Sequence, residues 1–460
     1  MTAGAATADP EARASRSGAV IPARAALASL VAVYVLLAVA FAAPGSRVVL
    51  ATAGGSPDWL LGPLRGLGWS GADGNSAGPL FYLGLWLAML AYVAVLLLAR
   101  SIGPRLAITT IAGLNLLFLL APPLLSQDVF SYISYARLDV LHHLGPYTHS
   151  PDAVPSDAVY GFAGSKDASS AYGPLFTIVT LPLAKVAPAT AFWILKTGAA
   201  LATLGVVALT WACARRLGRD PVMPAMVVGL NPLVLVHVVG GAHNDALTVV
   251  LWMGAALAML PVTGRLHPAE NRGRSEAVAG ALVVTSAAVK VIGGLVGPFL
   301  LAVARRPWAF LAGAVAAATA CAAAAVIAFG GSAAEAFVLL GQNQDRTTRW
   351  SLPQRTADGI AALTGGSADS IVDFTRAAFV VGFVVVLVLL LLHTWRQRDE
   401  PGAWIAPAGW ATLALLLATA WLVPWYAIWL LPLAALTTDK RLLAASLALC
   451  AYMLVIAVPL

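Results

Sequence analysis

Apolar residues gather in long blocks that short polar connections separate along almost the whole chain. Many blocks approach the roughly 20 residues that an α-helix needs to cross a lipid bilayer. No region alternates as the strands of a membrane β-barrel do. The pattern predicts an all-α, polytopic transmembrane protein with about 11–14 spans. The main blocks are 25–44, 79–99, 106–125, 190–213, 221–240, 246–262, 308–329, 371–392, 404–421, 425–437 and 441–458.

Two further apolar segments are ambiguous. Residues 276–304 are interrupted by Lys290, three glycines and a proline, which predicts two short helices or one broken helix. Residues 174–188 are short and either cross the membrane or re-enter it. Basic residues favour cytoplasmic loops, and that bias favours an arrangement in which 174–188 does not cross and 276–304 crosses twice. The alternative, in which each crosses once, moves the turn at His243 to the other side.

Composition agrees with a membrane protein. The chain has 460 residues, of which 60% are hydrophobic and 11% charged, whereas a soluble domain carries about a quarter charged residues. The net charge of +7 is attributed to basic loops rather than to nucleic-acid binding. The three cysteines lie in or at the end of apolar stretches, which indicates core residues without a disulfide framework. We expect residues 1–24 to be a disordered cytoplasmic tail and residues 25–460 to form one transmembrane domain.

Residues 126–173 form the longest polar segment, expected on the outer side. Asp128 is the acid at the very end of a span, and Tyr132 would lie near it on a helix over 128–139. A carboxylate there can act as a general base, because a low-dielectric surrounding raises its pKa toward the working pH. The alternative is that Asp128 caps the helix N-terminus.

A second polar group, His243, Asn244 and Asp245, interrupts an otherwise apolar region. Polar groups at membrane depth are costly and usually functional. The alternative is that they cap the helix that begins at Ala246. His243 and Asp245 lack an obvious third ligand, so no metal site is predicted.

Three other features suggest binding roles but have simpler explanations. Lys290 either extends to an interface or binds phosphate at the broken helix. Arg346 and Arg349, in the second outer loop (330–370), either bind phosphate or belong to a solvated loop with internal ion pairs. Trp425 and Tyr426 either belong to an interfacial belt or form a platform for sugar or polyprenyl.

The segments "SQDVFSYISYARL", "GPYTHSP", "SAYGPLF", "GGAHNDAL" and "PWYAIWLLP", with a lysine in a broken helix, resemble the actinobacterial polyprenol-phosphomannose-dependent α-(1→6)-mannosyltransferases. The resemblance is closest to the MptB branch and runs from about residue 80 to the C-terminus. It implies a GT-C fold in the plasma membrane, with an active site that faces away from the cytoplasm. It also implies a sugar donor on polyprenyl phosphate, a lipid-anchored α-1,6-mannan (lipomannan) acceptor and no cofactor.

The resemblance assigns Asp128 as the base that deprotonates the acceptor 6-hydroxyl in an inverting transfer. Lys290, with Arg346 or Arg349, would stabilise the leaving phosphate. No second acid follows Asp128 directly, so we expect metal-independent activity. The alternatives are a GT-C enzyme for another sugar or a protein acceptor, and a transporter of lipid-linked sugars. The remaining expected substrate contacts are Gln127, Tyr132, Tyr172, His243, Asn244, Asp245, Trp425 and Tyr426.

Overall fold

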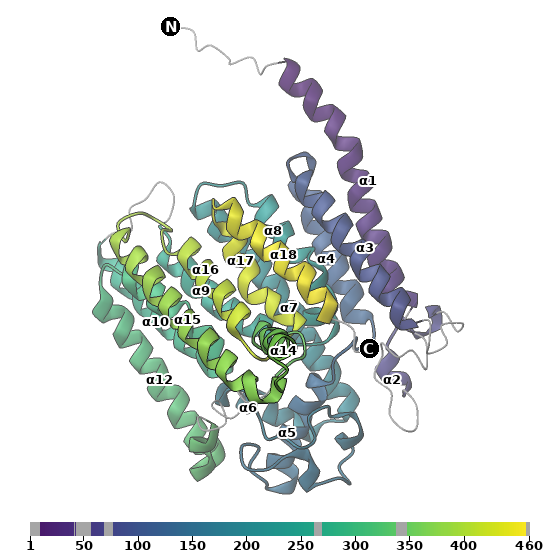
Figure 1. Cartoon of the computed structure of the whole chain (residues 1–460), viewed down its shortest axis with the longest axis vertical. Helices are drawn as coiled ribbons and strands as arrows, with labels where there is room; N and C mark the ends of the chain where they lie inside the picture. The colour runs from purple at the N-terminus through teal and green to yellow at the C-terminus, as the bar shows by residue number, and fades with distance from the viewer. Residues whose placement is uncertain are drawn as a thin grey trace.

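The computed structural model describes residues 10–40, 42, 57–68, 77–261, 269–336 and 347–456, and the regular elements within these ranges are all helical (Figure 1). The predicted all-α class is confirmed. The α-helices are α1 (Pro10–Ala40), α2 (Asp58–Leu61), α3 (Ala77–Leu97), α4 (Pro104–Leu120), α5 (Asp128–His142), α6 (Pro174–Thr180), α7 (Pro188–Arg216), α8 (Val222–Gly229), α9 (Asp245–Met259), α10 (Ala269–Val289), α11 (Gly297–Val303), α12 (Pro307–Phe329), α14 (Leu352–Thr364), α15 (Ala368–Arg396), α16 (Ile405–Ala418), α17 (Ala427–Leu436) and α18 (Lys440–Ile456). Shorter helical turns are η1 (Arg65–Leu67), η2 (Ala99–Ser101), η3 (Pro151–Ala153), η4 (Tyr160–Phe162), η5 (Leu181–Lys185), η6 (Val234–Gly240, a π-helix), η7 (Val291–Gly294), η8 (Gly330–Ala334) and η10 (Pro424–Tyr426).

Several of these helices can cross a membrane. Five are long and apolar enough by themselves, and α8 with η6 forms a sixth candidate that is bent by 61°. Shorter apolar helices, among them α4, α9, α16 and α17, pack with them. The protein is therefore a polytopic helical membrane protein. The expected total of about 11–14 spans depends on the shorter segments and stays a prediction.

The first helix is longer than the sequence predicted. It begins at Pro10, so the expectation of a disordered tail is wrong for residues 10–24, and residues 1–9 lie outside the described residues. The physical reason is composition: this stretch is rich in alanine and arginine, which favour helix, and it continues directly into an apolar span.

The bundle has two ends, and the basic connections collect at one of them. There Arg305 pairs with Asp399, and Arg219 donates a hydrogen bond to the Leu436 carbonyl. The carboxylate of Glu276 accepts hydrogen bonds from the backbone N–H groups of Arg305 and Arg306, at 3.0 and 2.6 Å. We call this the basic end, and the end that carries α5 the site end.

The packing of α10 and α12 resolves the ambiguity about residues 276–304. Gly273 lies against Arg306, and Gly280 lies against Phe310 of α12, so the two helices run side by side in the same direction. Residues 290–306 must therefore return the chain to the basic end. This is the arrangement with two passes, which the basic residues favoured.

Residues 174–188 do not run the length of the bundle. Helix α6 packs against α5, α10 and α12, and the N–H of Gly173 donates to the Val289 carbonyl at the end of α10, at 3.1 Å. The chain thus stays at the site end between α5 and α7. The turn at His243 consequently lies at the same end as Asp128.

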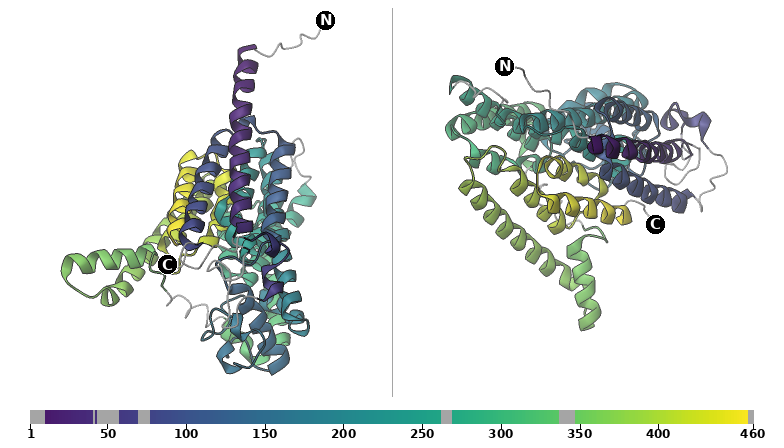
Figure 2. Two further views of the ribbon diagram at one scale, coloured as in Figure 1. Left: turned by 90° about the vertical axis from the view of Figure 1, so that its right-hand side faces the viewer. Right: turned by 90° about the horizontal axis from the view of Figure 1, so that it is seen from above.

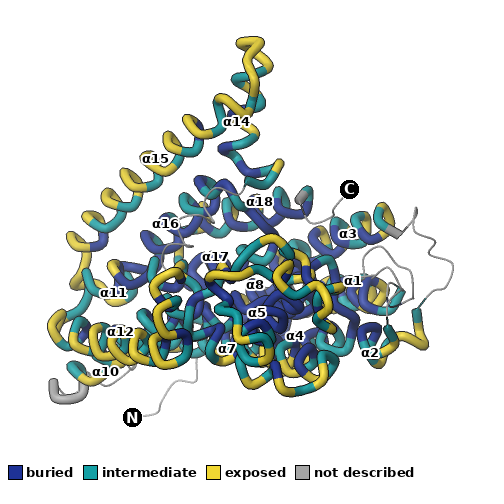
Figure 3. The backbone as a smooth tube through the Cα atoms, turned by 90° about the horizontal axis from the view of Figure 1, so that it is seen from below, coloured by how far each residue is buried: buried dark blue, intermediate teal, exposed yellow. Residues whose placement is uncertain are grey.

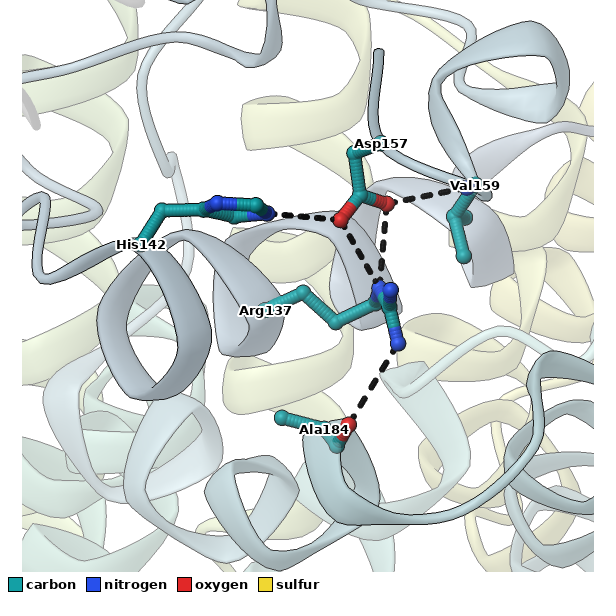
Figure 4. A network of polar contacts seen from close by, with 5 residues as sticks. All are labelled: Arg137, His142, Asp157, Val159 and Ala184. Atoms are coloured by element: carbon teal, nitrogen blue, oxygen red, sulfur yellow. Dashed lines mark hydrogen bonds and ion pairs between the residues drawn. The ribbon is translucent and has the colours of Figure 1, made fainter. Parts of the chain in front are cut away.

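Residues 126–187 form a layer over the site end, which we call the α5 layer (Figures 1 and 2). A partly buried ion-pair network holds it together (Figure 4). Asp157 accepts two hydrogen bonds from Arg137 Nε, at 3.0 and 3.1 Å, one from the Val159 N–H at 2.9 Å, and contacts His142 Nε2 at 2.8 Å. Burial opposes ionisation of Asp157, but these partners outweigh it and hold its pKa below the usual value.

Helix α15 stands apart from the bundle (Figures 2 and 3). It meets the bundle mainly through α16 and α11, and much of its apolar surface is exposed. An apolar groove lies between α15 and α16. A second groove, nearer the basic end, lies between α15 and the α11–α12 connection. Phe379, Gly382, Phe383, Val386, Leu417 and Ala418 are among the residues that line the first groove.

Candidate active site

Asp128 is the first residue of α5 and follows a strained connection from α4. Leu125 has a left-handed backbone with φ 59°, which is uncommon for a residue other than glycine. Gln127 occupies the N-cap position, and no side chain caps this helix. The capping role considered for Asp128 is therefore wrong. Its carboxylate instead lies with Oδ2 3.5 Å from His243 Nε2, and 32% of the side chain is exposed.

The pKa of Asp128 is lowered, so the predicted rise is wrong. Burial does favour the neutral acid, as expected. The hydrogen bond and charge of His243, the charge of Lys290 and a hydrogen bond from Tyr172 together outweigh burial. None of these partners is close to Asp128 in sequence, so the direction of the shift could not be read from the apolar surroundings. The carboxylate is consequently ionised at neutral pH.

A cavity of about 430 Å³ opens in front of Asp128. The α5 layer supplies its polar wall, and the break after α10 supplies Lys290. Phe383 lines both this cavity and the groove between α15 and α16, so the two hollows adjoin at this side chain. The wall includes Asp128, Ser131, Tyr135, Ser169, Tyr172, Lys290, Ile292, Phe383, Leu416, Trp421, Trp425, Tyr426 and Trp429.

His243 lies directly behind Asp128 and is fully buried. Its Nδ1 is 2.7 Å from the carbonyl oxygen of His237, and its Nε2 is 3.0 Å from Ser126 Oγ. The imidazole stacks on Trp425, with ring centroids 3.9 Å apart. These contacts fix the ring with Nε2 directed at Asp128.

Asp245 and Lys290 form a second buried pair. Asp245 is the first residue of α9 and is fully buried. Its Oδ1 accepts hydrogen bonds from Lys290 Nζ at 2.8 Å and from Trp429 Nε1 at 2.7 Å. Lys290 adopts an extended conformation at the break between α10 and η7, and Nζ also lies 4.9 Å from the centre of the Tyr426 ring. The broken helix thus points an ammonium group into the cavity, as the sequence suggested.

The structure separates the predicted site residues into groups. Asp128, Tyr172, Lys290, Trp425 and Tyr426 line the cavity. The residues that lie buried behind its wall are Tyr132, His243, Asn244 and Asp245.

The other predicted residues lie elsewhere. Gln127 is exposed beside Gly164 and is not part of the wall. Arg349 is exposed and covers the Trp350 ring at 5.5 Å, and it does not line the cavity either. Arg346 lies outside the described residues.

Buried polar atoms without hydrogen-bond partners concentrate behind the wall. Among the described side chains they include both amide atoms of Asn244 and Oδ2 of Asp245. Unsatisfied buried polar groups are costly and are uncommon away from functional sites. These atoms lie next to the Asp128 and Lys290 pairs, behind the cavity wall.

Sequence reasoning missed three residues that build the site. Ser126 contacts His243, and Trp429 holds Asp245. Lys196, buried in α7, donates a hydrogen bond to the Ala121 carbonyl just after α4 and so anchors the connection that leads to Asp128. An available signal for Lys196 was its charge in the middle of an otherwise apolar block.

The described residues contain no group of three or more His, Cys, Asp or Glu side chains that could hold a metal ion. Metal-independent activity stays a prediction.

Comparison with known proteins gives consistent results. Residues 32–306 match the family described as α-(1→6)-mannopyranosyltransferase, N-terminal domain, and residues 347–460 match the MptB C-terminal domain. The chain is 31% identical over 366 residues to α-(1→6)-mannopyranosyltransferase A of Mycobacterium tuberculosis, which covers 74% of this chain and 67% of that protein. It is 26% identical over 352 residues to α-(1→6)-mannopyranosyltransferase B of Corynebacterium glutamicum, which covers 69% of this chain and 56% of that protein. No solved structure matches the chain.

Proposed function

Because the chain belongs to the α-(1→6)-mannopyranosyltransferase family, we propose that it moves mannose from polyprenyl-phosphate-mannose to the 6-hydroxyl of a lipid-anchored α-1,6-mannan. The transfer inverts the anomeric configuration and extends a lipomannan backbone. One observation carries the proposal: the ionised Asp128 faces a chamber that adjoins an apolar groove at Phe383. Such a chamber suits a donor with a sugar head and a hydrocarbon tail.

The two halves of the cavity match the two halves of this donor. The groove between α15 and α16 offers aromatic and aliphatic contacts for an isoprenoid chain. Lys290 lines the polar chamber together with Phe383, and its ammonium group can contact the phosphate. Tyr172, Trp425 and Tyr426 offer aromatic surfaces for sugar rings in the same chamber.

The proposed chemistry is a single displacement. Asp128 takes the proton of the acceptor 6-hydroxyl while that oxygen bonds to C1 of mannose. The C1–oxygen bond to phosphate breaks, and its electron pair leaves with polyprenyl phosphate. Attack opposite the leaving group inverts the anomeric centre, as in inverting glycosidases that need one base and no covalent intermediate. Lys290 offsets the charge that grows on the phosphate, and Arg346 and Arg349 stay proposed helpers.

We place the site end on the extracytoplasmic face of the plasma membrane. The positive-inside trend supports this placement, because the connections around Arg219, Arg305 and Lys440 all lie at the opposite end of the bundle. Polyprenyl-linked donors suit that face, where the acceptor glycan would also lie.

The direct test is Asp128→Asn in purified protein reconstituted with polyprenyl-phosphate-mannose and a short α-1,6-mannoside acceptor. We expect mannose transfer to fall by roughly 10²–10⁴-fold, the usual contribution of a general base. Asp139→Asn is the matched control, because Asp139 lies on the same helix but does not line the cavity. Transfer at the wild-type rate by the folded Asp128→Asn protein would refute the proposal. Replacing the donor by another polyprenyl-phosphate sugar tests the choice of mannose.

A further inference from the structure

We propose that His243 is a positioning residue that holds the proton which Asp128 removes from the acceptor. The inference rests on the proposed function and extends it by one step. Asp128 touches the substrate, and His243 acts only through Asp128. The pair then forms a two-stage base, with the carboxylate in front and the imidazole behind.

The hydrogen bonds of His243 determine which nitrogen is free. A carbonyl oxygen can only accept, so the 2.7 Å contact with the His237 carbonyl places a proton on Nδ1. Nε2 is the remaining site for a second proton. It lies 3.0 Å from Ser126 Oγ and 3.5 Å from Asp128 Oδ2. A neutral ring accepts from the Ser126 hydroxyl, and a protonated ring donates to Asp128.

The position of His243 excludes direct contact with substrate. No part of the residue is exposed, and Trp425 covers one ring face. The backbone is left-handed at Leu125 and at Ala242, with φ 59° and 57°. These residues directly precede Ser126 and His243, which contact each other through Ser126 Oγ and His243 Nε2. Unfavourable backbone geometry of this kind collects at sites where function requires it.

The other charged and titratable groups around Asp128 and His243 are less suited to exchange a proton with Asp128. Lys290 is the nearest cation, but its ammonium group already pairs with the Asp245 carboxylate. Among the described residues, the other titratable side chains that face Asp128 or His243 are Tyr132, Tyr172, His237 and Tyr426. Of all these groups, His243 is the one that offers Asp128 a ring nitrogen able to accept a proton, 3.5 Å from Oδ2.

The proton balance is complete without another reactant. The acceptor hydroxyl gives its proton to Asp128, whose oxygen passes it to Nε2, and the electron pair of the broken C1–oxygen bond goes to the phosphate. Asp128 is again a carboxylate, stabilised by the imidazolium. Because His243 has no exposed atom, the proton leaves through Asp128 to water in the cavity after the products depart.

The test compares pH–rate profiles of the wild type and His243→Gln at saturating substrates. Glutamine can still donate a hydrogen bond to Asp128 but does not titrate between pH 5 and 8. We expect the wild-type rate to fall on the acid side as His243 binds a second proton, because the doubly protonated ring cannot take the proton of the acceptor. We expect the rate of the variant to be independent of pH between pH 5 and 8. At the alkaline plateau its rate should be about tenfold or more below that of the wild type, within the range for general-base effects. A wild-type acid limb in the variant would overturn the inference.

His142→Gln is the matched control. His142 Nε2 also faces a carboxylate, that of Asp157 at 2.8 Å, but the pair does not line the cavity. This variant should keep the wild-type profile, so a flattened profile in both variants would also overturn the inference.

Ser126→Ala keeps the inference testable if His243→Gln does not fold. Loss of the Ser126 hydroxyl removes the hydrogen bond that Nε2 of the neutral His243 ring accepts. The protonated ring still donates to Asp128, so the substitution destabilises the neutral form relative to the protonated form. The acid limb should therefore move to higher pH by about half to one unit, and an unmoved limb would count against the inference. Asp128→Asn distinguishes failure of the proposed function from failure of the role assigned to His243. An active Asp128→Asn protein refutes the proposed function itself, whereas an inactive one combined with an unchanged His243→Gln profile refutes only the role of His243.

Discussion

Lys290 faces the cavity and also neutralises a buried carboxylate, so its substitution should have two separable effects. Asp245 is fully buried, and Lys290 supplies the ammonium group 2.8 Å from its Oδ1. Lys290→Met would leave that carboxylate charged without a cation. Removing one partner of a buried ion pair costs about 3–5 kcal/mol. We expect the lower end, because the Trp429 hydrogen bond remains and the Lys290 side chain is 16% exposed.

The double variant Lys290→Met/Asp245→Asn should recover most of this stability. Asparagine carries no charge, and its amide oxygen can still accept the Trp429 N–H. Thermal unfolding in nanodiscs, followed for the wild type, both single variants and the double variant, measures the coupling. A midpoint for Lys290→Met equal to that of the wild type would contradict the role of the pair.

Donor affinity should behave differently from stability. A hydrogen bond to a charged group contributes about 1.5–3 kcal/mol, so loss of the Lys290 contact should raise the KM for polyprenyl-phosphate-mannose roughly 10- to 150-fold. The KM for the acceptor should change little. The double variant should regain stability and keep the raised donor KM. If it regains the wild-type donor KM as well, Lys290 serves only to neutralise Asp245, and its phosphate role must be given up.

Two further results are expected. Gly241→Ala should lower transfer about tenfold, in the range of general-base effects, because the new Cβ would lie 2.5 Å from the His237 carbonyl oxygen and 2.8 Å from the His243 ring and would displace both; transfer at the wild-type rate by the folded variant would show that the ring tolerates movement. Asp157→Asn should loosen the α5 layer by about 2 kcal/mol, measured by amide hydrogen exchange over residues 143–170, because Arg137 and His142 lose their common carboxylate. The pKa of Asp157 is lowered in the fold, so its stabilisation is complete above the ordinary carboxyl pKa of about 4 and is lost as the pH falls below it. Faster exchange of this region should therefore begin only below about pH 4 in the wild type, and its onset at pH 6 would contradict the assignment.

The sequence predicted the helical membrane fold because crossing a bilayer imposes a length and a polarity that can be read locally. It also located Asp128, because a carboxylate at the end of an apolar block is visible in one short stretch. The basic residues favoured the correct arrangement of 174–188 and 276–304 over the alternative. The same local reasoning failed for residues 10–24, where helix propensity continued beyond the apolar block.

Partners distant in sequence could not be predicted. The motif at 243–245 looked like one functional unit, but its residues have separate partners: His243 contacts Asp128, and Asp245 forms an ion pair with Lys290. The direction of the Asp128 pKa shift depends on these pairings, which arise only when α5, α9 and α10 meet. Trp429 looked like one of several belt aromatics until its N–H was found on Asp245.

The separation of α15 from the bundle has a consequence for how the enzyme would be supplied. The apolar groove between α15 and α16 would let a long hydrophobic anchor slide in from the bilayer plane without passing through water. Turnover would then follow the number of donor molecules per area of membrane, and spent carrier could depart along the same two-dimensional path while the growing polymer stays in place.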